Sequence, residues 1–451
     1  MKILVVGSGG REHALVWKLA QSPHQPAIYC APGNPGIAAL ATCVPIQADD
    51  VEQLAKFAKE ERIDLTVVGP EVALAKGIVD LFEQQDLLIF GPRKAGAQIE
   101  SSKSWAKQLM LDAGVPTAAY RVFTDLAQAR DFILKETPPV VLKADGLAAG
   151  KGVVVAQSTE EALSALDDMM ANQVFGQAGA QVVVEQYLTG PEATLLAFVD
   201  GTDYVLMVPA QDHKPVFDDN KGPNTGGMGT YSPVPDMTDD VIKQVETTIV
   251  QPILQELKQR GIHYKGVLYT GLMLTADGPY VIEFNARFGD PETQVVLPRL
   301  KTDLVDICLS IAQSPYEDQD VDQDQNTVQD QEKGTGNPKT PRLSELKIEW
   351  FDNAAVCVVI TAAGYPGNYK KGDMIAGLAA VETARTVVFH AGTAWQDGAI
   401  VTNGGRVLGV TGFGETLQQA REQAYAAVHS IEFAGMHYRT DIGKKAMERS
   451  K

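Results

Sequence analysis

The sequence predicts a multidomain protein of α/β and α+β architecture, and three observations support this. A chain of 451 residues is long enough for about three domains. Residues 1–101 alternate short apolar runs with helical patterns, and residues 343–451 show a second mixture of strand and helix patterns. A low-complexity acidic segment precedes the second unit. We therefore expect domains at 1–101, 102–316 and 343–451, with a linker at 317–342.

The composition argues against several classes of protein. The net charge of -18 disfavours a general nucleic-acid surface, and no apolar run reaches the roughly 18 to 20 residues of a membrane span. The first residues, MKILVVG, resemble a short strand meeting a glycine rather than a signal peptide. The four cysteines are widely spaced and include no C-x-x-C pair, which argues against a disulfide framework or a zinc site and for a reducing cytosol.

Residues 1–101 have the pattern of a doubly wound, Rossmann-like domain. Short apolar runs alternate with amphipathic segments, as in a buried parallel sheet covered by helices. Such sheets bind ligands at the carboxyl ends of their strands. Strands are expected near 3–6, 27–29, 65–68 and 87–89, and helices near 11–20, 51–61 and 72–84.

A glycine-rich turn follows the first expected strand. Gly9 and Gly10 permit close approach of backbone amides to an anion, and Arg11 opens a helix whose N-terminus favours negative charge. A dinucleotide motif would need a third glycine where Glu12 stands, and its usual acid after the second strand is missing, so a monophosphate or small polar ligand is preferred. The residues at neighbouring strand ends that would line the same crevice, or simply form turns, are Asn34, Gly36 and Glu71.

A lysine-bearing hairpin follows a helix that begins at 101–103 and ends at 114–116. Lys143 lies in an apolar strand, the glycine-rich loop DGLAAGKG spans 145–152, and another apolar strand follows. This predicts a mobile lid over phosphates rather than a P-loop, in which a helix would follow the lysine. A charge in an apolar strand is costly without an anionic partner, and a structural ion pair is the alternative for Lys143.

Two later segments also suggest ligand contacts. A strand at 181–185 runs into an extended segment whose backbone groups could imitate a base pair for adenine, with Glu192 near the ribose; otherwise the segment is a linker. The polar and glycine-rich loops at 211–214 and 222–229 favour close approach to a small ligand, with disorder as the alternative. No metal is assigned to His213.

The chemical centre is expected at 280–294, YVIEFNARFGDPETQ. An apolar strand at 267–275, an Asp-Gly turn and a returning strand place Glu283 and Asn285 on one strand face. A carboxylate beside an amide oxygen suits a hard cation such as Mg²⁺. Arg287, two residues further on, would point to the same face, and its guanidinium can bind a phosphate or carboxylate with two hydrogen bonds. The alternative is an edge strand with solvated charges.

These motifs carry a resemblance to a known family. Lys103, Lys143, the DGLAAGKG loop, the EQYL segment and the EFNARFGDPETQ block are similar to ATP-grasp ligases. With GSGGREH at the start and PNTGGMG at 223–229, nearly the whole chain resembles the phosphoribosylamine–glycine ligase family. The resemblance implies an ATP-grasp core at 102–316, a lid subdomain at about 118–188 and a small α+β C-terminal domain. It also implies ATP-dependent ligation of glycine to 5-phosphoribosylamine through glycyl phosphate, with Mg²⁺ or Mn²⁺.

The resemblance assigns roles to individual residues. Arg287, Lys143 and Asp212 would act in catalysis, and Glu283 with Asn285 would hold the metal. The nucleotide would contact Lys103, Lys143, Asp145, Gly146, Gly150, Lys151, Gly152, Glu185, Tyr187, Leu188 and Glu192. The substrates would contact Gly9, Gly10, Arg11, Asn34, Gly36, Glu71, Asp212, His213, Lys214, Asn224, Thr225, Gly226, Gly227 and Arg287.

One feature departs from the wider superfamily. Many members carry a second carboxylate metal ligand on the neighbouring strand, but residues 271–275 contain none, which argues against a second metal site. The C-terminal unit is expected to contain strands near 355–361, 386–391 and 406–411 and a helix near 416–431, and its sequence indicates no chemistry of its own.

We predict that deletion of residues 319–338 leaves catalysis intact. The segment 317–340 has low complexity and a large excess of acids, so it cannot bury apolar surface and is expected to be a hydrated linker. Steady-state ligation by the folded deletion variant tests this. A large loss of turnover in that variant would refute it.

Three other functions share part of the pattern. Another ligase of the same superfamily, such as a carboxylase, would share the lid and the metal strand. A nucleotide sensor would bind ATP without releasing ADP, and an oxidoreductase would bind nicotinamide or flavin, for which the residues are lacking. Only the favoured function requires glycine and 5-phosphoribosylamine together. We expect a cytoplasmic monomer with no nucleic-acid or membrane partner.

Overall fold

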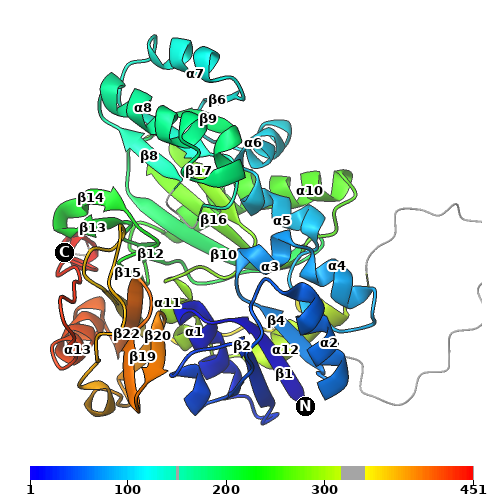
Figure 1. Cartoon of the computed structure of the whole chain (residues 1–451). Helices are drawn as coiled ribbons and strands as arrows, with labels where there is room; N and C mark the ends of the chain where they lie inside the picture. The colour runs from blue at the N-terminus through cyan, green and yellow to red at the C-terminus, as the bar shows by residue number, and fades with distance from the viewer. Residues whose placement is uncertain (149–151, 316–340, 450–451) are drawn as a thin grey trace, which may run out of the picture.

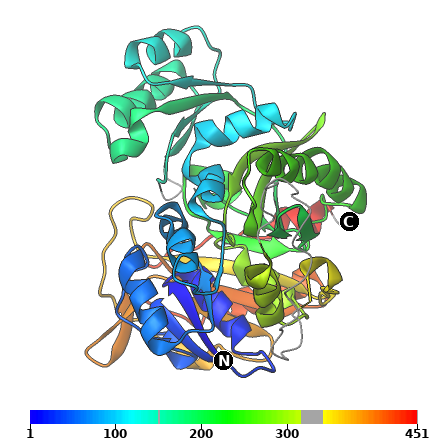
Figure 2. The same ribbon diagram turned by 90° about the vertical axis from the view of Figure 1, so that its right-hand side faces the viewer.

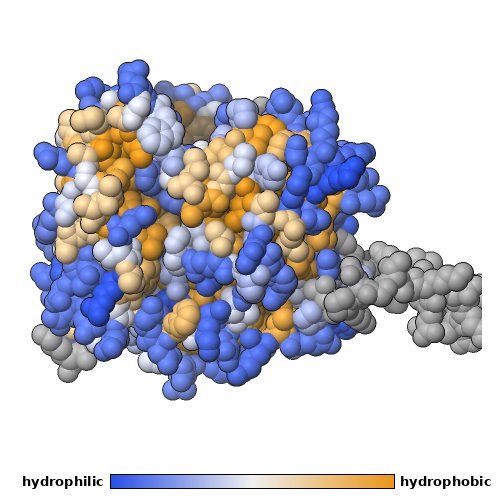
Figure 3. Space-filling model, turned by 90° about the horizontal axis from the view of Figure 1, so that it is seen from below, coloured by the Kyte–Doolittle hydropathy of each residue, from blue (hydrophilic) through white to orange (hydrophobic). Residues whose placement is uncertain are grey.

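The computed structural model describes residues 1–148, 152–315 and 341–449. The expectations for Gly150, Lys151 and the acidic segment 317–340 lie outside these residues. Within the described ranges, none of the helices is long and apolar enough to cross a membrane. The face seen from below mixes hydrophilic and apolar residues (Figure 3).

The N-terminal unit is a five-stranded parallel sheet in the order β3-β2-β1-β4-β5. Its central strand is an apolar run that is buried along nearly its whole length, because helices cover both faces. The expected Rossmann-like fold is therefore confirmed (Figure 1). The strands are β1 (Lys2–Gly7), β2 (Ala27–Pro32), β3 (Thr42–Cys43), β4 (Leu65–Val68) and β5 (Ile89–Phe90), and the first helices are α1 (Gly10–Leu19) and α2 (Val51–Glu61).

The single helix expected at 72–84 is wrong. The structure instead has α3 (Glu71–Ala75) and α4 (Ile78–Glu83), separated by Gly77 with φ of +82°. Glycine adopts this left-handed conformation without the strain of a Cβ, so the chain turns there. Glu71 is the first residue of the short helix α3, three residues after the end of β4.

The subdomain expected to be a lid, called the lid below, contains a four-stranded sheet in the order β6-β9-β7-β8, in which all neighbouring strands pair antiparallel. It stands above the rest of the molecule in Figures 1 and 2 and has its own apolar core, which includes Leu142, Leu166 and Val184. Its elements are β6 (Tyr120–Phe123), α7 (Leu126–Ile133), β7 (Val140–Ala144), β8 (Val153–Ala156), α8 (Thr159–Leu166) and β9 (Val182–Gln186). Below it lie α5 (Lys94–Ser101) and α6 (Lys103–Asp112), and Ser102 caps α6 by accepting a hydrogen bond from the Trp105 amide.

The central sheet has the order β11-β10-β16-β17 and contains the expected hairpin. Strands β16 and β17 pair antiparallel, as the apolar run and the Asp277-Gly278 signal predict. The two-residue turn is Ala276-Asp277, one residue earlier than expected, and Gly278 opens β17 opposite Thr275. The elements are β10 (Glu192–Asp200), β11 (Asp203–Leu206), α9 (Asp239–Val245), α10 (Gln251–Gln259), β16 (Lys265–Thr275), β17 (Gly278–Asn285), α11 (Thr293–Val296) and α12 (Leu304–Gln313).

The C-terminal sheet combines distant parts of the chain in the order β12-β15-β18-β22-β19. Two short strands from the polar loops after β11 extend this sheet. Strand β12 pairs with β15, and β15 pairs with the expected C-terminal strand β18, so Asp212 is held at the edge of the sheet. Its strands are β12 (Gln211–Asp212), β15 (Gly229–Ser232), β18 (Ala354–Thr361), β19 (Thr386–His390) and β22 (Arg406–Gly414), and α13 (Leu417–Val428) packs on it. Nearby are the hairpins β13 (Pro215–Phe217) with β14 (Lys221–Asn224) and β20 (Thr393–Gln396) with β21 (Ala399–Thr402), and α14 (Lys444–Arg449).

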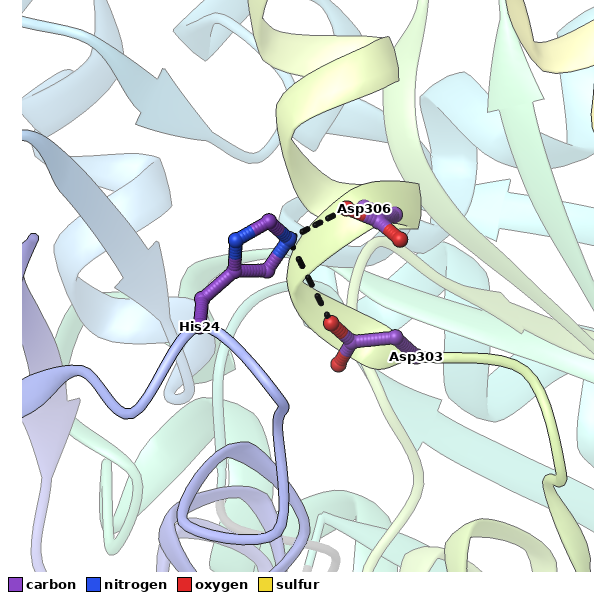
Figure 4. A group of neighbouring side chains, drawn as sticks. All are labelled: His24, Asp303 and Asp306. Atoms are coloured by element: carbon purple, nitrogen blue, oxygen red, sulfur yellow. Dashed lines mark hydrogen bonds and ion pairs between the residues drawn. The ribbon is translucent and has the colours of Figure 1, made fainter.

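Polar contacts join the N-terminal unit to the rest. His24 points toward two acids at the start of α12, with its Nε2 atom 2.8 Å from Asp306 Oδ1 and 3.7 Å from Asp303 Oδ2 (Figure 4). On α1, His13 is buried, and its Nδ1 accepts a hydrogen bond of 2.8 Å from the backbone N–H of His390. Burial and the neighbouring His390 lower the pKa of His13 to about 3, which keeps it a neutral acceptor. These contacts fix the units that surround the site.

Candidate active site

The candidate site is a cavity of about 260 Å³ between the N-terminal unit, the lid, the central sheet and the C-terminal sheet. A larger hollow of about 1650 Å³ shares several lining residues with it, so the two adjoin. Expected site residues that line the smaller cavity are Arg11, Glu71, Lys103, Lys143, Gly146, Gly152, Glu185, Asp212, Lys214, Thr225, Gly226, Glu283, Asn285 and Arg287. Tyr187, Leu188, Glu192, His213 and Asn224 line the larger hollow.

The strand β17 brings a carboxylate and an amide oxygen to the cavity. Burial alone would raise the pKa of Glu283, but Lys214, Lys143 and further cations lower it to about 2, so the carboxylate is charged. Among the described residues, the Oδ1 atom of Asn285 accepts one long hydrogen bond, of 3.4 Å, from Arg287. This pair of oxygen donors fits a hard cation.

Gly271 explains why the neighbouring strand carries no second acid at this level. It lies directly opposite Glu283 across the hairpin. A Cβ added at Gly271 would lie 3.2 Å from Cγ of Glu283, closer than ordinary contact. A carboxylate side chain at this position would therefore crowd Glu283.

The two expected phosphate lysines reach the cavity from different elements. Lys103, at the start of α6, donates a hydrogen bond of 2.8 Å to the Gly146 carbonyl in the lid. Lys143, on β7, donates one of 2.9 Å to the Ile282 carbonyl and lies 3.0 Å from Glu185 Oε1. The ion pair considered as the alternative for Lys143 is therefore present, and it lies at the cavity wall.

Arg287 is held in place by two acids from other parts of the chain. Its Nε is 3.1 Å from Glu71 Oε2, and its Nη2 is 2.7 Å from Glu100 Oε1. Burial raises the pKa of Glu100 to about 7 despite the nearby Arg287, whereas burial of Glu71 is outweighed by Arg287 and Arg11, which lower its pKa to about 2. The guanidinium is therefore oriented before any ligand arrives. Glu100 was missed, because its burial was not visible in the sequence.

The glycine-rich turn expected to receive a phosphate makes mainly internal contacts. The Gly9 amide donates to Glu12 Oε2 at 2.6 Å, and Asn34 Nδ2 donates to the carbonyls of Ser8 and His390, each at 2.8 Å. Gly36 lies so close to the rings of His13 and His390 that a Cβ there would clash. Gly9, Gly10, Asn34 and Gly36 line neither of the two cavities.

The polar loops at 211–227 converge on the cavity. Lys214 Nζ lies 3.4 Å from Glu192 and 3.6 Å from Glu283, which links the expected ribose and metal residues. Burial raises the pKa of Asp212 to about 8 against the attraction of Lys214. Thr225 Oγ1 donates to the Lys214 carbonyl at 2.7 Å, and beside it a Cβ at Gly227 would meet Pro291 at 2.4 Å.

His213 lies in the same loop and lines the larger hollow. Its ring lies 5.8 Å from the ring of Tyr231, and its Nδ1 is 3.3 Å from the Gly229 carbonyl. Burial lowers the pKa of this imidazole to about 4, so it is neutral near pH 7. The described neighbours include no cluster of metal-ligating side chains around it.

Arg406 and Glu292 are further charged residues of the site that were not assigned from the sequence. Arg406, at the start of β22, lies 2.9 Å from Asp290 Oδ2 and donates to the Asp290 and Gly226 carbonyls. Glu292 Oε1 accepts a hydrogen bond of 2.8 Å from the Tyr269 hydroxyl. Both Arg406 and Glu292 line the cavity. Glu292 belongs to the block already singled out, whereas Arg406 had only a glycine-rich corner, Asn403 to Gly405, as a signal.

Comparison with known proteins identifies the family. Family models match residues 1–100, 101–293 and 355–445, described as the N domain, the ATP-grasp (A) domain and the C domain of phosphoribosylglycinamide synthetase. The chain is 49% identical over 447 residues to phosphoribosylamine–glycine ligase of Halalkalibacterium halodurans. The alignment covers 99% of this chain and 97% of that protein. It is 48% identical over 442 residues to the same ligase of Caldanaerobacter subterraneus subsp. tengcongensis, covering 98% and 99%.

Solved structures agree with these sequence relationships. The crystal structure of phosphoribosylamine–glycine ligase from Thermotoga maritima superposes with a TM-score of 0.77 at 32% identity, covering 98% of this chain and 100% of that one. The biotin carboxylase domain of Hydrogenobacter thermophilus 2-oxoglutarate carboxylase, with a TM-score of 0.72, 15% identity and coverage of 99% and 98%, shares the fold alone. From the full-length similarity and the matching domains, the chain belongs to the phosphoribosylamine–glycine ligase family of ATP-grasp enzymes.

Proposed function

We propose that the cavity between the lid and the β16–β17 hairpin is where this ligase joins glycine to 5-phosphoribosylamine. The reaction uses ATP to convert glycine to glycyl phosphate, which the amine attacks to give glycinamide ribonucleotide, ADP and phosphate. The observation that supports this site is convergence. Two lysines, an arginine and a carboxylate–amide pair from separate elements line one cavity: Lys103, Lys143, Arg287, Glu283 and Asn285.

ATP would lie between the lid and β17. Lys103 and Lys143 would contact its phosphates, while Asp145, Gly146 and Gly152 shape the loop above them. Asp145 is held in place because its Oδ1 accepts a hydrogen bond of 3.1 Å from the Ser104 amide. The residues that would receive adenine and ribose line the larger hollow, and Glu185 also lines the smaller cavity: Glu185, Tyr187, Leu188 and Glu192.

Glu283 and Asn285 would hold the divalent cation, with Mg²⁺ or Mn²⁺ both compatible with oxygen donors. A cation bound there would neutralise charge on the phosphates. Arg287, already oriented by Glu71 and Glu100, would stabilise the transferred phosphoryl group. Phosphoryl transfer depends mainly on such positioning and charge stabilisation, so the site needs no protein base for that step.

The two substrates would enter beside this centre. Glycine and its acyl phosphate would contact the segments 212–214 and 224–227, whose backbones approach the cavity closely. The ribosyl phosphate would lie toward Arg11, Glu71 and the Gly9-Gly10 turn, with Asn34 and Gly36 supporting that turn. Arg406 would add a fixed guanidinium from the C-terminal sheet, since it lines the same cavity.

Release of ADP with single components omitted tests the proposed function. The complete mixture contains ATP, Mg²⁺, glycine and 5-phosphoribosylamine, and we expect ADP release at the full rate only with all four present. ADP release without either substrate, or glycinamide ribonucleotide formation without ATP, would contradict the proposal. We further infer that the protein is a cytoplasmic monomer. Sedimentation of the purified chain tests the oligomeric state.

Arg406→Lys is expected to raise KM for 5-phosphoribosylamine by about tenfold while KM for ATP stays the same. Lysine keeps the charge beside Asp290 but cannot reproduce a two-pronged contact with a phosphate, and tenfold corresponds to about 1.4 kcal/mol. Steady-state kinetics with each substrate varied in turn measure this. The exposed Arg385→Lys is the matched control. Equal KM values for all substrates in Arg406→Lys would remove the assigned role.

A further inference from the structure

A buried cluster of three charges connects α6 to the lid. Lys107, Lys143 and Glu185 are 2%, 3% and 5% exposed. Lys107 Nζ lies 3.1 Å from Glu185 Oε2, and Lys143 Nζ lies 3.0 Å from Glu185 Oε1. One carboxylate therefore bridges two ammonium groups, one from the helix below the lid and one from the lid sheet. The triad reaches the cavity, which all three residues line.

The two lysines have different partners besides Glu185. Lys107 Nζ also donates a hydrogen bond of 2.7 Å to Thr117 Oγ1 and lies 5.4 Å from the centre of the Tyr120 ring. By contrast, Glu185 Oε1 has no hydrogen-bond partner of good geometry among the described residues, so charge alone attracts it to Lys143. Lys143 Nζ donates its own hydrogen bond, of 2.9 Å, to the Ile282 carbonyl at the cavity wall. Lys107, held by Thr117, is therefore the partner that can keep Glu185 paired when Lys143 turns toward a ligand.

A buried triad of this kind is weak evidence for a role in stability. Removing charges from water is costly, and packed apolar side chains often stabilise a fold as well or better. The triad has one positive charge in excess, and the surplus lies at the cavity wall where an anion would bind. If Lys143 turned toward an anion without Lys107 present, Glu185 would be left as an unpaired buried carboxylate, which is strongly unfavourable.

We propose that Lys107 is a positioning residue, which holds Glu185 so that Lys143 is free to engage the phosphates of ATP. This inference rests on the proposed function of the cavity, because it assumes that the nucleotide binds there. Lys107 itself need not touch the nucleotide. It acts by keeping the carboxylate paired and in place during the reorientation of Lys143.

The electrostatics give the proposal a pH signature. Burial lowers the pKa of Lys107 to about 8, with Glu185 opposing the shift and Lys143 adding to it. The charged and titratable groups that face it are Glu185 on β9, Lys143 on β7 and Tyr120 on β6. Above this pKa the ammonium loses its proton and no longer pairs with Glu185. An arginine in its place would stay protonated over the same range.

The test compares Lys107→Met, Lys107→Arg, Glu185→Gln and the double variant Lys107→Met/Glu185→Gln by steady-state ADP release. We expect Lys107→Met to lower turnover by about 10- to 100-fold, the range for a lost hydrogen bond to a charged group, with little change in KM for glycine. Lys107→Arg should restore most of the turnover and keep it to higher pH than the wild type. The double variant should be no worse than the poorer single variant, because both disrupt the same pair.

Several outcomes would overturn the proposal. Fully additive losses in the double variant would show that Lys107 acts independently of Glu185. Wild-type turnover in a folded Lys107→Met protein would contradict the positioning role of Lys107. If Lys107→Met did not fold and Lys107→Arg had the same pH profile as the wild type, Lys107 would have a structural role only. Absence of ADP release by the wild type would instead contradict the proposed function. The exposed Lys371→Met, outside the site, is the matched control.

Discussion

Glu283→Gln is expected to reduce turnover by about 10²- to 10³-fold without unfolding the protein, the range seen when one group that stabilises transition-state charge is removed. The wild-type carboxylate is ionised because Lys214 and Lys143 lower its pKa to about 2 despite burial. Glutamine has the same shape but no charge, so the cation would lose its anionic ligand while the packing of β17 is kept. Steady-state ADP release over a series of Mg²⁺ concentrations measures the change, with thermal unfolding as the check on folding.

The dependence of the rate on Mg²⁺ concentration shows whether such a loss arises from metal binding by Glu283 or from another role of this carboxylate. If Glu283 holds the cation, the variant should require more Mg²⁺ for half-maximal rate as well as being slower. The exposed Glu382→Gln, which removes one acid from the surface, should behave as the wild type. Near-normal turnover and Mg²⁺ dependence in folded Glu283→Gln would show that the metal lies elsewhere.

Local sequence patterns were sufficient for the elements but not for their assembly. The hairpin of β16 and β17 could be predicted from an apolar run and a nearby Asp-Gly pair, although its turn lies one residue earlier, at Ala276-Asp277. The pairing of β15 with β18 joins Tyr231 to Val356, across more than a hundred residues, and no short pattern encodes it. The break at Gly77 was missed because an isolated glycine also occurs inside continuous helices.

The same division applies to the site. Glu283, Asn285 and Arg287 lie close together in the sequence, so their common direction could be predicted from strand geometry. Glu100 and Arg406 contribute only because the fold brings them beside Arg287 and Asp290, respectively. Charges of this kind look like ordinary surface residues until their burial is known.

Lys143→Ala is expected to lower turnover by about 10²-fold or more, again the range for one lost charge contact in the transition state. The fold should survive, because Glu185 keeps Lys107 as its ion-pair partner at 3.1 Å and so is not left as an isolated buried charge. The variant should lower turnover and leave KM for glycine nearly unchanged, because the Lys143 ammonium would stabilise charge that develops on the phosphoryl group in the transition state. Steady-state kinetics with ATP and glycine varied separately distinguish the two parameters.

Two controls make this result specific to the position of the charge. The exposed Lys371→Ala removes one cation from the surface and should leave turnover unchanged. Lys143→Arg keeps the charge but is bulkier at a residue only 3% exposed, so it should recover part of the turnover. Near-normal turnover in folded Lys143→Ala would show that the pair with Glu185 is purely structural. A loss of turnover that Lys143→Arg partly reverses would instead show that the reaction needs a positive charge at this wall of the cavity. An effect of overall charge would be the same in Lys371→Ala, which removes one cation from the surface.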